Sequence, residues 1–378
     1  MIINMKRKTV GIDIRDLRIA KTGARTYLEE LIKALKTHSD KHFNYVFLDS
    51  YFHPYTGKNK ILKLLEHISF FTWKNVILPF KAFFKGCDLV LCTDFFVPYI
   101  HLNFKTISVF HDAFFLEYPA HYNKYWLYLF KTYGINAALR AKAVVTPTLY
   151  TKKKIAELTK IPFSKLVAIH EAPKSLKINV KVEISDINTS LSDKMYLLHV
   201  GTMEKRKNIP NLIRTFKQLS DKYPALKLVL LGQFSPKSDM DDELEILSEI
   251  KKLNLKDKII FPGYVKDEFL SVYYKNALAY IFPSINEGFG LPILEAFAHQ
   301  IPVLAANNSC LPEVGGDAVV YFDPINIEDM ILKTEMILND ESLRLELIKK
   351  GDARLKAFSW EKTADQFVNL FHEILEKE

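Results

Sequence analysis

The sequence has few cysteines and no long hydrophobic run, and each shortage argues against a class of protein. Its three cysteines, Cys87, Cys92 and Cys310, are odd in number and lack the spacing of zinc ligands. This disfavours a disulfide framework and a zinc site, and predicts a reduced, cytoplasmic chain. No uninterrupted apolar stretch approaches the ~18–20 residues that cross a bilayer, so no membrane-spanning helix is predicted.

The length and composition are those of a globular protein with two domains. The chain has 378 residues, of which 48% are hydrophobic and 25% are charged. Such a chain can bury a sizeable core, and its length exceeds that of one ordinary domain. Short apolar runs alternate with amphipathic helical patterns, which indicates an α/β protein with parallel sheets and helices on both faces.

The alternation occurs twice along the chain. In the first half, strands are predicted at residues 9–14, 44–49, 88–93, 106–110, 143–146 and 166–169, with helices near 24–37, 122–139 and 150–159. In the second half, strands are predicted at 195–200, 226–231, 258–261, 279–282, 303–305 and 319–321, with helices near 209–221, 241–253, 267–276, 292–299 and 359–377. The polar residues 174–194 lack a helical period and are predicted to link two domains.

Positive charge is concentrated in the first half. Residues 1–172 hold 26 Lys and Arg against 13 Asp and Glu, a net charge of +13, whereas the remainder holds 26 against 31, a net charge of −5. A basic half is expected to contact a phospholipid surface, a lipid-pyrophosphate acceptor or nucleic acid. We find no module with base-reading or stacking residues, so nucleic acid is not predicted as a partner.

The segment Lys60–Lys85 has two interpretations. Lysines interleave with aromatic residues there: Lys60, Lys63, Lys74, Lys81 and Lys85 with Phe70, Phe71, Trp73, Phe80, Phe83 and Phe84. This mixture suits docking on an anionic membrane surface, which would place the protein peripherally on the inner face of the cell membrane. It equally suits a buried helical hairpin whose lysines reach solvent.

The most specific chemistry is concentrated in residues 279–296. An apolar strand pattern ends at Pro283, a glycine-containing loop follows, and a helix is predicted to begin at Pro292. Backbone N–H groups and the positive end of a helix dipole at the end of a strand favour phosphate binding. Glu287 and Glu295 flank this place, and carboxylates pair readily with sugar hydroxyls. Together these features predict a nucleotide-sugar ligand.

Glu287 and Glu295 also have the spacing of an E-x7-E motif, and the chain resembles the retaining glycosyltransferases of family four, which have the GT-B fold. Other signatures of that family follow in the right order: Val200–Thr202 with Lys205–Asn208, Pro262–Val265, Ile301–Val303 and Leu311–Ala318, and more loosely Thr22–Arg25 and His111–Asp112. The resemblance implies two Rossmann-like, doubly wound domains facing a central cleft. Residues 1–173 would form the acceptor side and residues 195–358 the nucleotide-sugar side, with helix 359–378 packing back on the first domain.

The resemblance also assigns donor-binding roles. Arg206 and Lys207 match a basic pair that grips the phosphates. Glu295 matches a glutamate that bonds the ribose hydroxyls, and Glu287 matches one that meets the donor sugar. The further donor-binding positions are Gly23, Thr202, Val265, Gly288, Phe289, Gly290 and Leu291. Some members carry arginine where this chain has Thr202, so the cationic role rests on Arg206 and Lys207. Taken alone, the basic turn also suits a solvated loop, and Glu295 suits an acid that complements a helix dipole.

His111 and Asp112 end a predicted strand of the first half. A lone histidine is more often structural than catalytic, but this pair matches the family's His-Asp pair, whose histidine contacts the sugar near its reacting carbon. The expected catalytic residues are therefore His111, Asp112 and Glu287. Gly23 matches a glycine that lies over the donor phosphates or the acceptor, with Arg25 as a further anion contact; otherwise it belongs to a simple turn.

The sequence thus predicts a retaining, metal-independent glycosyltransferase that moves a sugar from a nucleotide-diphosphate sugar to a hydroxyl acceptor, a lipid-linked or free glycan of bacterial surface polysaccharide. No metal or other cofactor is expected, and the D-x-D triplet at residues 239–241 is interpreted as acidic capping of a surface helix. The nucleotide base is not indicated. The alternatives are a nucleotide-sugar epimerase or hydrolase on the same fold and a basic nucleic-acid-binding protein.

Overall fold

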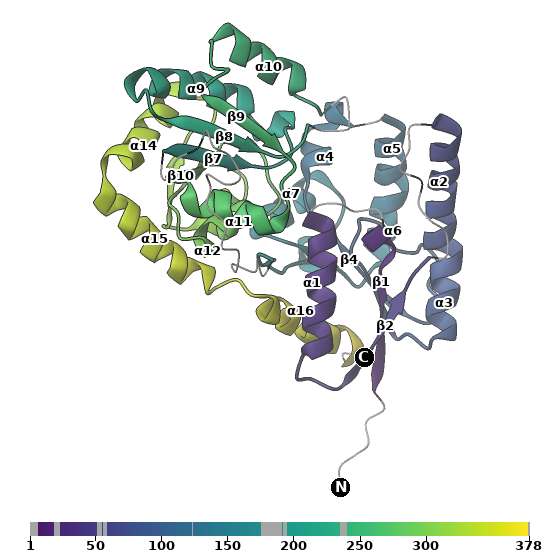
Figure 1. Cartoon of the computed structure of the whole chain (residues 1–378). Helices are drawn as coiled ribbons and strands as arrows, with labels where there is room; N and C mark the ends of the chain where they lie inside the picture. Colours follow the sequence, from purple (N-terminus) through teal and green to yellow (C-terminus); the bar gives the residue numbers. More distant parts are fainter. Residues whose placement is uncertain are drawn as a thin grey trace. The chain divides into compact units, whose positions relative to one another are not determined.

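The computed structural model describes residues 7–18, 23–50, 55, 59–122, 124–174, 191, 195–234 and 240–376. The chain divides into two compact units (Figure 1): residues 1–172 with 359–378 form unit 1, and residues 173–358 form unit 2. Most of the predicted linker, residues 175–190 and 192–194, lies outside the described residues. Within the described ranges, no helix is long and apolar enough to cross a membrane.

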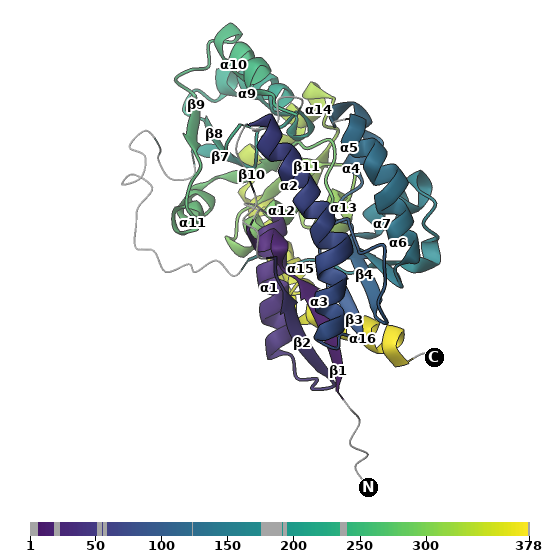
Figure 2. The same cartoon turned by 90° about the vertical axis from the view of Figure 1, so that its right-hand side faces the viewer.

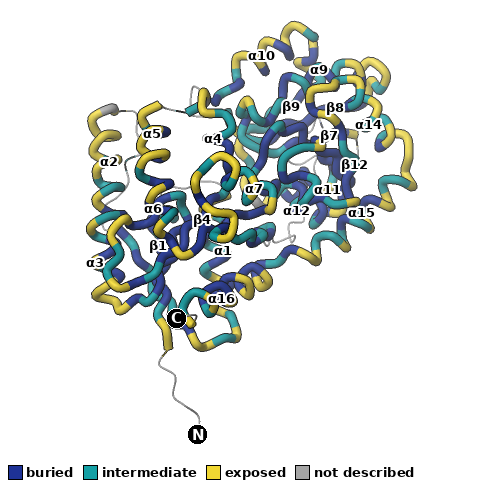
Figure 3. Tube along the Cα trace, turned by 180° about the vertical axis from the view of Figure 1, so that it is seen from behind, coloured by how far each residue is buried: buried dark blue, intermediate teal, exposed yellow. Residues whose placement is uncertain are grey.

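Unit 1 is built on a six-stranded parallel sheet with the strand order β2-β1-β3-β4-β5-β6. Its strands are β1 (Lys8–Asp13), β2 (Phe43–Leu48), β3 (Leu89–Cys92), β4 (Lys105–Val109), β5 (Ala143–Thr146) and β6 (Leu166–Ala168). Every residue of β3 and of β5 is buried. Because successive side chains of a strand point to opposite faces, both faces of this sheet are covered. Figure 3 shows the inner strand β4 mainly in dark blue, as buried, whereas most of the outer strand β2 is of intermediate burial.

The helices of unit 1 include two long composite runs. The helices are α1 (Gly23–Thr37), α2 (Lys60–Thr72), α3 (Leu78–Phe84), α4 (Phe114–Glu117), α5 (Lys124–Leu129), α6 (Ile135–Arg140), α7 (Leu149–Leu158) and α16 (Trp360–Glu376). The π-helical turns Trp73–Ile77 and Phe130–Gly134 join α2 to α3 and α5 to α6. Figure 2 shows α2 and α3 as one continuous helical run. The hairpin interpretation of Lys60–Lys85 is therefore wrong, because a π turn continues the helix where a hairpin would reverse it.

The C-terminal helix packs within unit 1. Figure 1 shows α16 beside α1, and the rings of Tyr27 and Trp360 lie 5.7 Å apart in an edge-on contact. The hydroxyl of Thr363 donates to the carbonyl oxygen of His170 (2.8 Å), which follows β6. The chain thus returns to its first unit after it has completed the second.

Unit 2 repeats the architecture with the strand order β12-β11-β10-β7-β8-β9, all pairs parallel. Its strands are β7 (Tyr196–Val200), β8 (Lys227–Leu231), β9 (Ile259–Gly263), β10 (Ala279–Phe282), β11 (Val303–Ala306) and β12 (Val319–Phe322). Its helices are α9 (Ile209–Lys222), α10 (Glu243–Lys252), α11 (Asp267–Asn276), α12 (Leu291–Ala298), α13 (Leu311–Gly315), α14 (Ile327–Asn339) and α15 (Glu341–Leu355).

Each sheet reverses its strand order at one place. In unit 2, the neighbours β7 and β10 start series that run in opposite directions across the sheet, β7-β8-β9 and β10-β11-β12. In unit 1, the reversal lies between β1 and β3. Doubly wound sheets bind ligands beyond the carboxyl ends of the strands at such a reversal. The loops after β7 and β10, and those after β1 and β3, are therefore where binding residues are expected.

The predicted elements agree closely with the structure. All twelve predicted strands are present, with boundaries that differ by at most two residues. The acidic run that includes the D-x-D triplet does precede a helix, since Asp242 stands at the N-cap of α10, although its side chain makes no capping hydrogen bond. Burial instead raises the pKa of Asp242 to about 6. Asp239, the first acid of the D-x-D triplet, lies outside the described residues.

Candidate active site

The loops after β7 and β10 are tied together in unit 2. The backbone N–H of Ile285 donates to the carbonyl oxygen of Arg206 (2.8 Å). Asn208 has a left-handed backbone conformation (φ 57°), which asparagine tolerates better than most residues, and its Nδ2 donates to the carbonyl oxygen of Pro283 (3.2 Å). The short helical turn Lys205–Lys207 is thereby fixed against the β10 loop.

Glu287 of the β10 loop binds both cations of that turn. Its Oε1 accepts a hydrogen bond from Nζ of Lys207 (2.5 Å), and its Oε2 accepts one from the guanidinium of Arg206 (2.6 Å). Glu204 accepts a further bond from Nε of Arg206 (2.8 Å). Glu287 and Lys207 are only 9% and 6% exposed. We call Arg206, Lys207 and Glu287 the Glu287 group.

Opposite charges keep the Glu287 group ionised. Burial alone would raise the pKa of Glu287, but the positive charges of Arg206 and Lys207 outweigh it and lower this pKa to about 2. Burial and the neighbouring Arg206 lower the pKa of Lys207, while Glu287 acts in the opposite direction. Glu287 therefore helps a buried lysine to lie beside a half-buried arginine, and Glu204 also pairs with that arginine.

Two glycines shape the backbone around the Glu287 group. Gly232, which follows β8, has φ +136°, and a Cβ atom there would lie 1.9 Å from the carbonyl oxygen of Gly201, which follows β7. Gly290 precedes α12 with φ +96°, and a Cβ atom there would lie 2.9 Å from the Leu311 side chain. Only glycine adopts these conformations freely at such close approach.

Glu295 lies on α12, one turn after Leu291, and is half-buried. Its Oε2 accepts a hydrogen bond from the hydroxyl of Tyr274 (3.0 Å). Burial, followed by the negative charges of Glu295 and Glu287, raises the pKa of Tyr280 on β10. Both glutamates of the E-x7-E motif therefore affect the pKa of the same buried tyrosine. This tyrosine lies on β10, which borders the strand-order reversal.

In unit 1, His111 lies at the carboxyl edge of the sheet, just after β4. Its Nε2 donates to the carbonyl oxygen of Thr93 (2.8 Å), and its Nδ1 faces Oε1 of Glu171 (3.3 Å). Burial would lower the pKa of His111, but the bond and charge of Glu171 outweigh it and raise that pKa. Since both ring nitrogens face acceptors, the structure favours the doubly protonated imidazolium.

A buried ion group occupies the strand-order reversal of unit 1. Nζ of Lys74 donates to Asp13 at the end of β1 (2.6 Å) and to Asp94, two residues after β3 (2.5 Å). The indole of Trp73 also donates to Asp13 (3.2 Å). Burial raises the pKa of Asp94 to about 7, against the opposing charge of Lys74. We call Asp13, Lys74 and Asp94 the Lys74 group.

The sequence of unit 2 matches a family model described as glycosyl transferases group 1, over residues 180–354. The O-antigen chain mannosyltransferase B of Escherichia coli is 30% identical over 285 residues, which is 74% of this chain and 72% of that protein. The chain belongs to the group 1 glycosyltransferases. This confirms the resemblance inferred from the E-x7-E motif and identifies the chain as a glycosyltransferase; it gives no support to the epimerase or nucleic-acid alternatives.

Solved structures confirm the GT-B fold of this group 1 glycosyltransferase. A sucrose-phosphate synthase from Thermosynechococcus elongatus superposes with a TM-score of 0.74 at 21% identity, covering 98% of this chain and 100% of that one. The HepE protein of Anabaena, in complex with UDP and glucose, superposes with a TM-score of 0.70 at 15% identity, covering 97% and 100%. The two parallel six-stranded sheets are the two Rossmann-like domains of this fold.

The predicted donor residues of the glycosyltransferase occupy different places in unit 2. Arg206, Lys207 and Glu287 are in direct contact, and the segment Gly288–Leu291 continues the same loop into α12. Thr202 follows β7 and is half-buried. Val265 is half-buried at the carboxyl end of β9, which β8 separates from β7.

The predicted residues of unit 1 are less closely associated. Oδ1 of Asp112 accepts a hydrogen bond from the backbone N–H of Phe114 (3.1 Å), so the carboxylate caps the short helix α4. Gly23 is exposed at the start of α1. Arg25 pairs with Glu29 one turn further along that helix (2.7 Å).

Sequence reasoning missed Glu171 and the Lys74 group. Glu171 follows β6 and Asp94 follows β3, so the strand-end rule that selected His111 could also have selected these carboxylates. Lys74 gave no such signal, because it stands in a run of lysines and aromatic residues that resembles a surface helix.

Proposed function

We propose that this glycosyltransferase transfers a sugar from a nucleotide-diphosphate sugar to a glycan hydroxyl with retention of configuration and without a catalytic metal. The observation that carries the proposal is the Glu287 group. It places a lysine and an arginine at the strand-order reversal of unit 2, in contact with the loop that leads into α12. The backbone N–H groups at the start of α12 add partial positive charge next to that loop.

The Glu287 group suits a departing diphosphate. When the bond between the sugar and the phosphate breaks, negative charge grows on the phosphate oxygens, and fixed cations stabilise that charge most where water is excluded. Lys207 is buried and Arg206 is half-buried, so both are held in place before the reaction. In this proposal they perform the charge neutralisation that a metal ion performs in other transferases.

Retention is carried over from the family resemblance, and the way in which Glu287 is engaged bears on the route to it. Both of its oxygens accept bonds from cations, which fits a role in holding the donor sugar better than nucleophilic attack. We therefore favour transfer on one face of the sugar. The acceptor oxygen forms its bond to the anomeric carbon as the phosphate oxygen leaves, and the leaving oxygen takes the proton of the incoming hydroxyl. Glu295 is assigned to the ribose hydroxyls and His111 to the transferred sugar.

Relatives indicate the class of acceptor. One relative is named an O-antigen chain mannosyltransferase. Mannose is therefore the first donor sugar to test, and a lipid-linked glycan of the bacterial surface is the proposed acceptor. The net charge of +13 over residues 1–172 suits an acceptor that carries pyrophosphate on a lipid.

Peripheral contact with an anionic membrane is part of the proposal. The described residues of the α2–α3 run and α5 expose many large apolar side chains: Ile61, Leu62, Leu64, Leu65, Ile68, Val76, Phe80, Phe83, Phe84, Tyr125, Tyr128 and Leu129. Figure 3 shows exposed turns on both α2 and α5. The two runs are adjacent, because the ring of Phe71 contacts that of Tyr133 (5.8 Å). Among the lysines, Lys63 and Lys85 are exposed, whereas Lys74 is buried. Such a surface favours shallow insertion among lipid headgroups.

A donor screen tests the proposed reaction. The full chain is incubated with UDP-, GDP- and dTDP-sugars, including GDP-mannose, and with lipid extract as the acceptor source, and release of nucleoside diphosphate is measured. We expect one donor to be turned over, and Lys207→Ala to lower that turnover at least about tenfold by removing a buried phosphate-binding cation.

Lys205→Ala is the matched control for Lys207→Ala. Lys205 belongs to the same helical turn but is exposed, so its removal changes the charge equally without opening the Glu287 group. Equal loss of activity in both variants would contradict the assignment of Lys207. Donor turnover in the absence of any acceptor, with an altered sugar as product, would contradict glycosyl transfer.

A further inference from the structure

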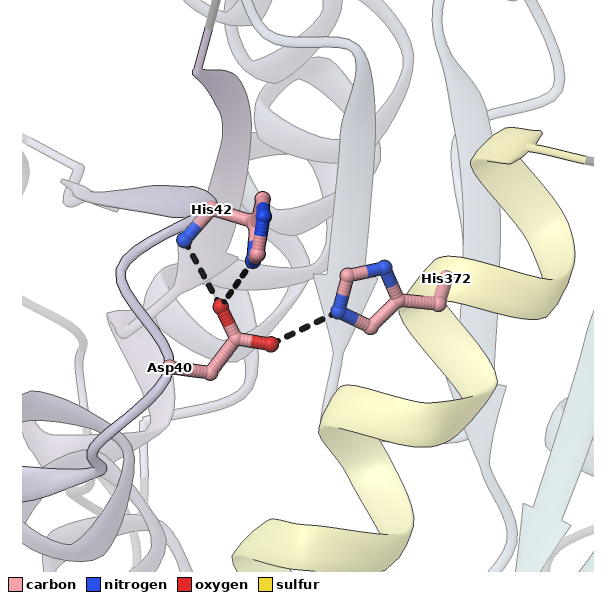
Figure 4. A group of neighbouring side chains, drawn as sticks. All are labelled: Asp40, His42 and His372. Atoms are coloured by element: carbon pink, nitrogen blue, oxygen red, sulfur yellow. Dashed lines mark hydrogen bonds and ion pairs between the residues drawn. The ribbon is translucent and has the colours of Figure 1, made fainter. Parts of the chain in front are cut away.

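Three potential metal ligands meet on unit 1, although 332 residues separate Asp40 from His372. Asp40 and His42 lie between α1 and β2, and His372 lies on α16 (Figure 4). Nδ1 of His42 donates to Oδ1 of Asp40 (2.6 Å), and Nε2 of His372 donates to Oδ2 (2.7 Å). One ligand atom from each residue lies within 4.8 Å of the other two. We call these residues the Asp40 group.

The ring of His372 is oriented from two sides. Its Nδ1 contacts the carboxylate of Glu376, one turn further along α16. The ring also makes an edge-on contact with Phe43, with 4.7 Å between the centroids. Nε2 is consequently directed at Asp40, as Figure 4 shows. A carboxylate on the second nitrogen is the arrangement that orients metal-binding histidines and increases their basicity.

The loop that carries Asp40 and His42 is fixed as well. The backbone N–H of His42 donates to Oδ1 of Asp40 (2.7 Å), and the backbone N–H of Asp40 donates to Nδ1 of His38 (3.1 Å). Nε2 of His38 in turn contacts Asp365 on α16 (2.8 Å). The loop is therefore held to α16 at two points, and the side chains of the Asp40 group start close to a common centre.

The two imidazoles are the side chains that face the Asp40 carboxylate, so a metal ion bound there takes the place of ring protons. The recorded partners of the Asp40 carboxylate are the two imidazoles and a backbone N–H, and no described lysine or arginine pairs with it. The other described set of potential ligands, Asp13, Cys92 and Asp94, differs in this respect. The ammonium of Lys74 already binds both of its carboxylates.

We propose that the Asp40 group binds a Zn²⁺ ion that clamps α16 to the junction of α1 and β2. The ligands are Nδ1 of His42, Nε2 of His372 and a carboxylate oxygen of Asp40, with water in the fourth position. Imidazole nitrogens select Zn²⁺ over Mg²⁺ or Ca²⁺, and zinc–nitrogen distances of about 2.0–2.1 Å require only modest rotation of these side chains. The His42 side chain is 61% exposed and can make that rotation.

The proposed role of the ion is structural. A link between Asp40 and His372 closes a loop that contains the whole of unit 2, and clips that close long loops restrict the unfolded chain most. The Asp40 group lies before β2, at the amino edge of the sheet of unit 1, whereas His111 lies at its carboxyl edge. This inference therefore stands or falls separately from the metal-independent chemistry proposed above.

Calorimetry on the full, tag-free chain tests the site. The protein is stripped with chelator, dialysed and titrated with zinc chloride, and its melting temperature is recorded with and without the metal. We expect saturable binding of one Zn²⁺ per chain and a higher melting temperature when it is bound. His42→Ala and His372→Ala should each weaken binding at least about tenfold.

His67→Ala is the control, because His67 is an exposed histidine of α2 outside the Asp40 group and its removal should leave zinc affinity unchanged. His42→Ala keeps the test decisive if His372→Ala fails to fold, since the His42 side chain is largely exposed. Cobalt(II) should give the intense visible bands of a four-coordinate site in the wild type and lose them in both variants. Absence of saturable zinc binding, or binding that survives His42→Ala, overturns the proposal.

Discussion

The Nδ1 atom of His111 lies 3.3 Å from Oε1 of Glu171, at the carboxyl edge of the sheet in unit 1. Both residues follow strands, β4 and β6, and Glu171 is buried. The carboxylate is the chief reason why the pKa of His111 is raised although burial acts to lower it. His111 therefore keeps its proton at a pH where a free histidine has lost it.

Glu171→Gln should lower the pKa of His111, because the amide keeps the shape of the side chain and removes its charge. If the protonated ring assists transfer, the basic limb of the kcat/KM profile should move to lower pH by the same amount. NMR titration of the His111 ring measures its pKa, and kcat/KM measured at a series of pH values locates the basic limb of the profile. Glu157→Gln, at an exposed carboxylate of α7, is the control that should move neither. An unchanged His111 titration would show that Glu171 does not set its proton affinity.

Glu287→Gln should separate nucleotide binding from sugar transfer. The change leaves Arg206 and Lys207 with one negative neighbour fewer, so affinity for a free nucleoside diphosphate should be retained or increased. Turnover should fall at least about tenfold, because the amide no longer holds the cations and the donor sugar in register. Calorimetry with the diphosphate and steady-state rates give the two measurements. Loss of diphosphate binding in parallel with turnover would contradict this division.

The same substitution should change how stability depends on pH. The pKa of Glu287 is about 2 in the folded protein, below the usual value near 4.5, so its ion pairs stabilise the fold above pH 4.5 and lose that effect as the pH falls towards 2. Breaking a buried pair costs about 3 kcal/mol. Denaturant unfolding should therefore show the largest difference between wild type and Glu287→Gln near neutral pH, and a shrinking difference below pH 4.5. A constant difference across that range would mean that Glu287 is not ionised in the folded state.

The contact of Glu287 with Arg206 and Lys207 was predictable, because local spacing and strand order determine it. Glu287 and Glu295 lie on one strand–loop–helix segment, which begins with β10. Arg206 and Lys207 follow β7, and β7 is a neighbour of β10 in the sheet. Lys74 was not predictable. The π turn that begins at Trp73 brings both Trp73 and Lys74 into the interior, against the pattern of exposed lysines around them.

Long-range pairings were equally invisible in the sequence. Asp40 and His372 show no common motif, since their contact arises only when α16 returns to unit 1 after all of unit 2 has been formed. The role of Glu171 was only partly predictable from the sequence. Its position after a strand was visible, but the choice of His111 as its partner depends on how the loops after β4 and β6 approach each other.

Gly232→Ala should destabilise unit 2 and remove donor binding. The new Cβ atom would lie 1.9 Å from the carbonyl oxygen of Gly201, and backbone atoms cannot yield as a flexible side chain can. We expect a loss of about 3 kcal/mol or more from strain and overpacking. Gly263→Ala is the matched control: it also has a positive φ (+75°), but no atom lies within 4 Å of the added carbon, so it should cost only about 1 kcal/mol. Thermal unfolding of both variants makes the comparison. Equal costs would show that the strands β7 and β8 separate more easily at this point than their geometry indicates.

Removal of exposed apolar side chains of α2 should weaken membrane contact. Ile61, Leu65 and Ile68 lie one or two turns apart on one side of the helix and are each more than half exposed, at 71%, 54% and 54%. Changing all three to serine should lower co-sedimentation with anionic phospholipid vesicles at least about fivefold, since each lost side chain removes about 1.5–3 kcal/mol of transferable apolar surface. The melting temperature should hardly change, because these side chains are not part of a core.

The control replaces exposed apolar residues of unit 2, Leu332, Met336 and Leu345, and should sediment as the wild type does. Neutral vesicles distinguish the contribution of charge: binding that ignores both the lipid charge and the α2 substitutions would exclude this surface as a membrane contact.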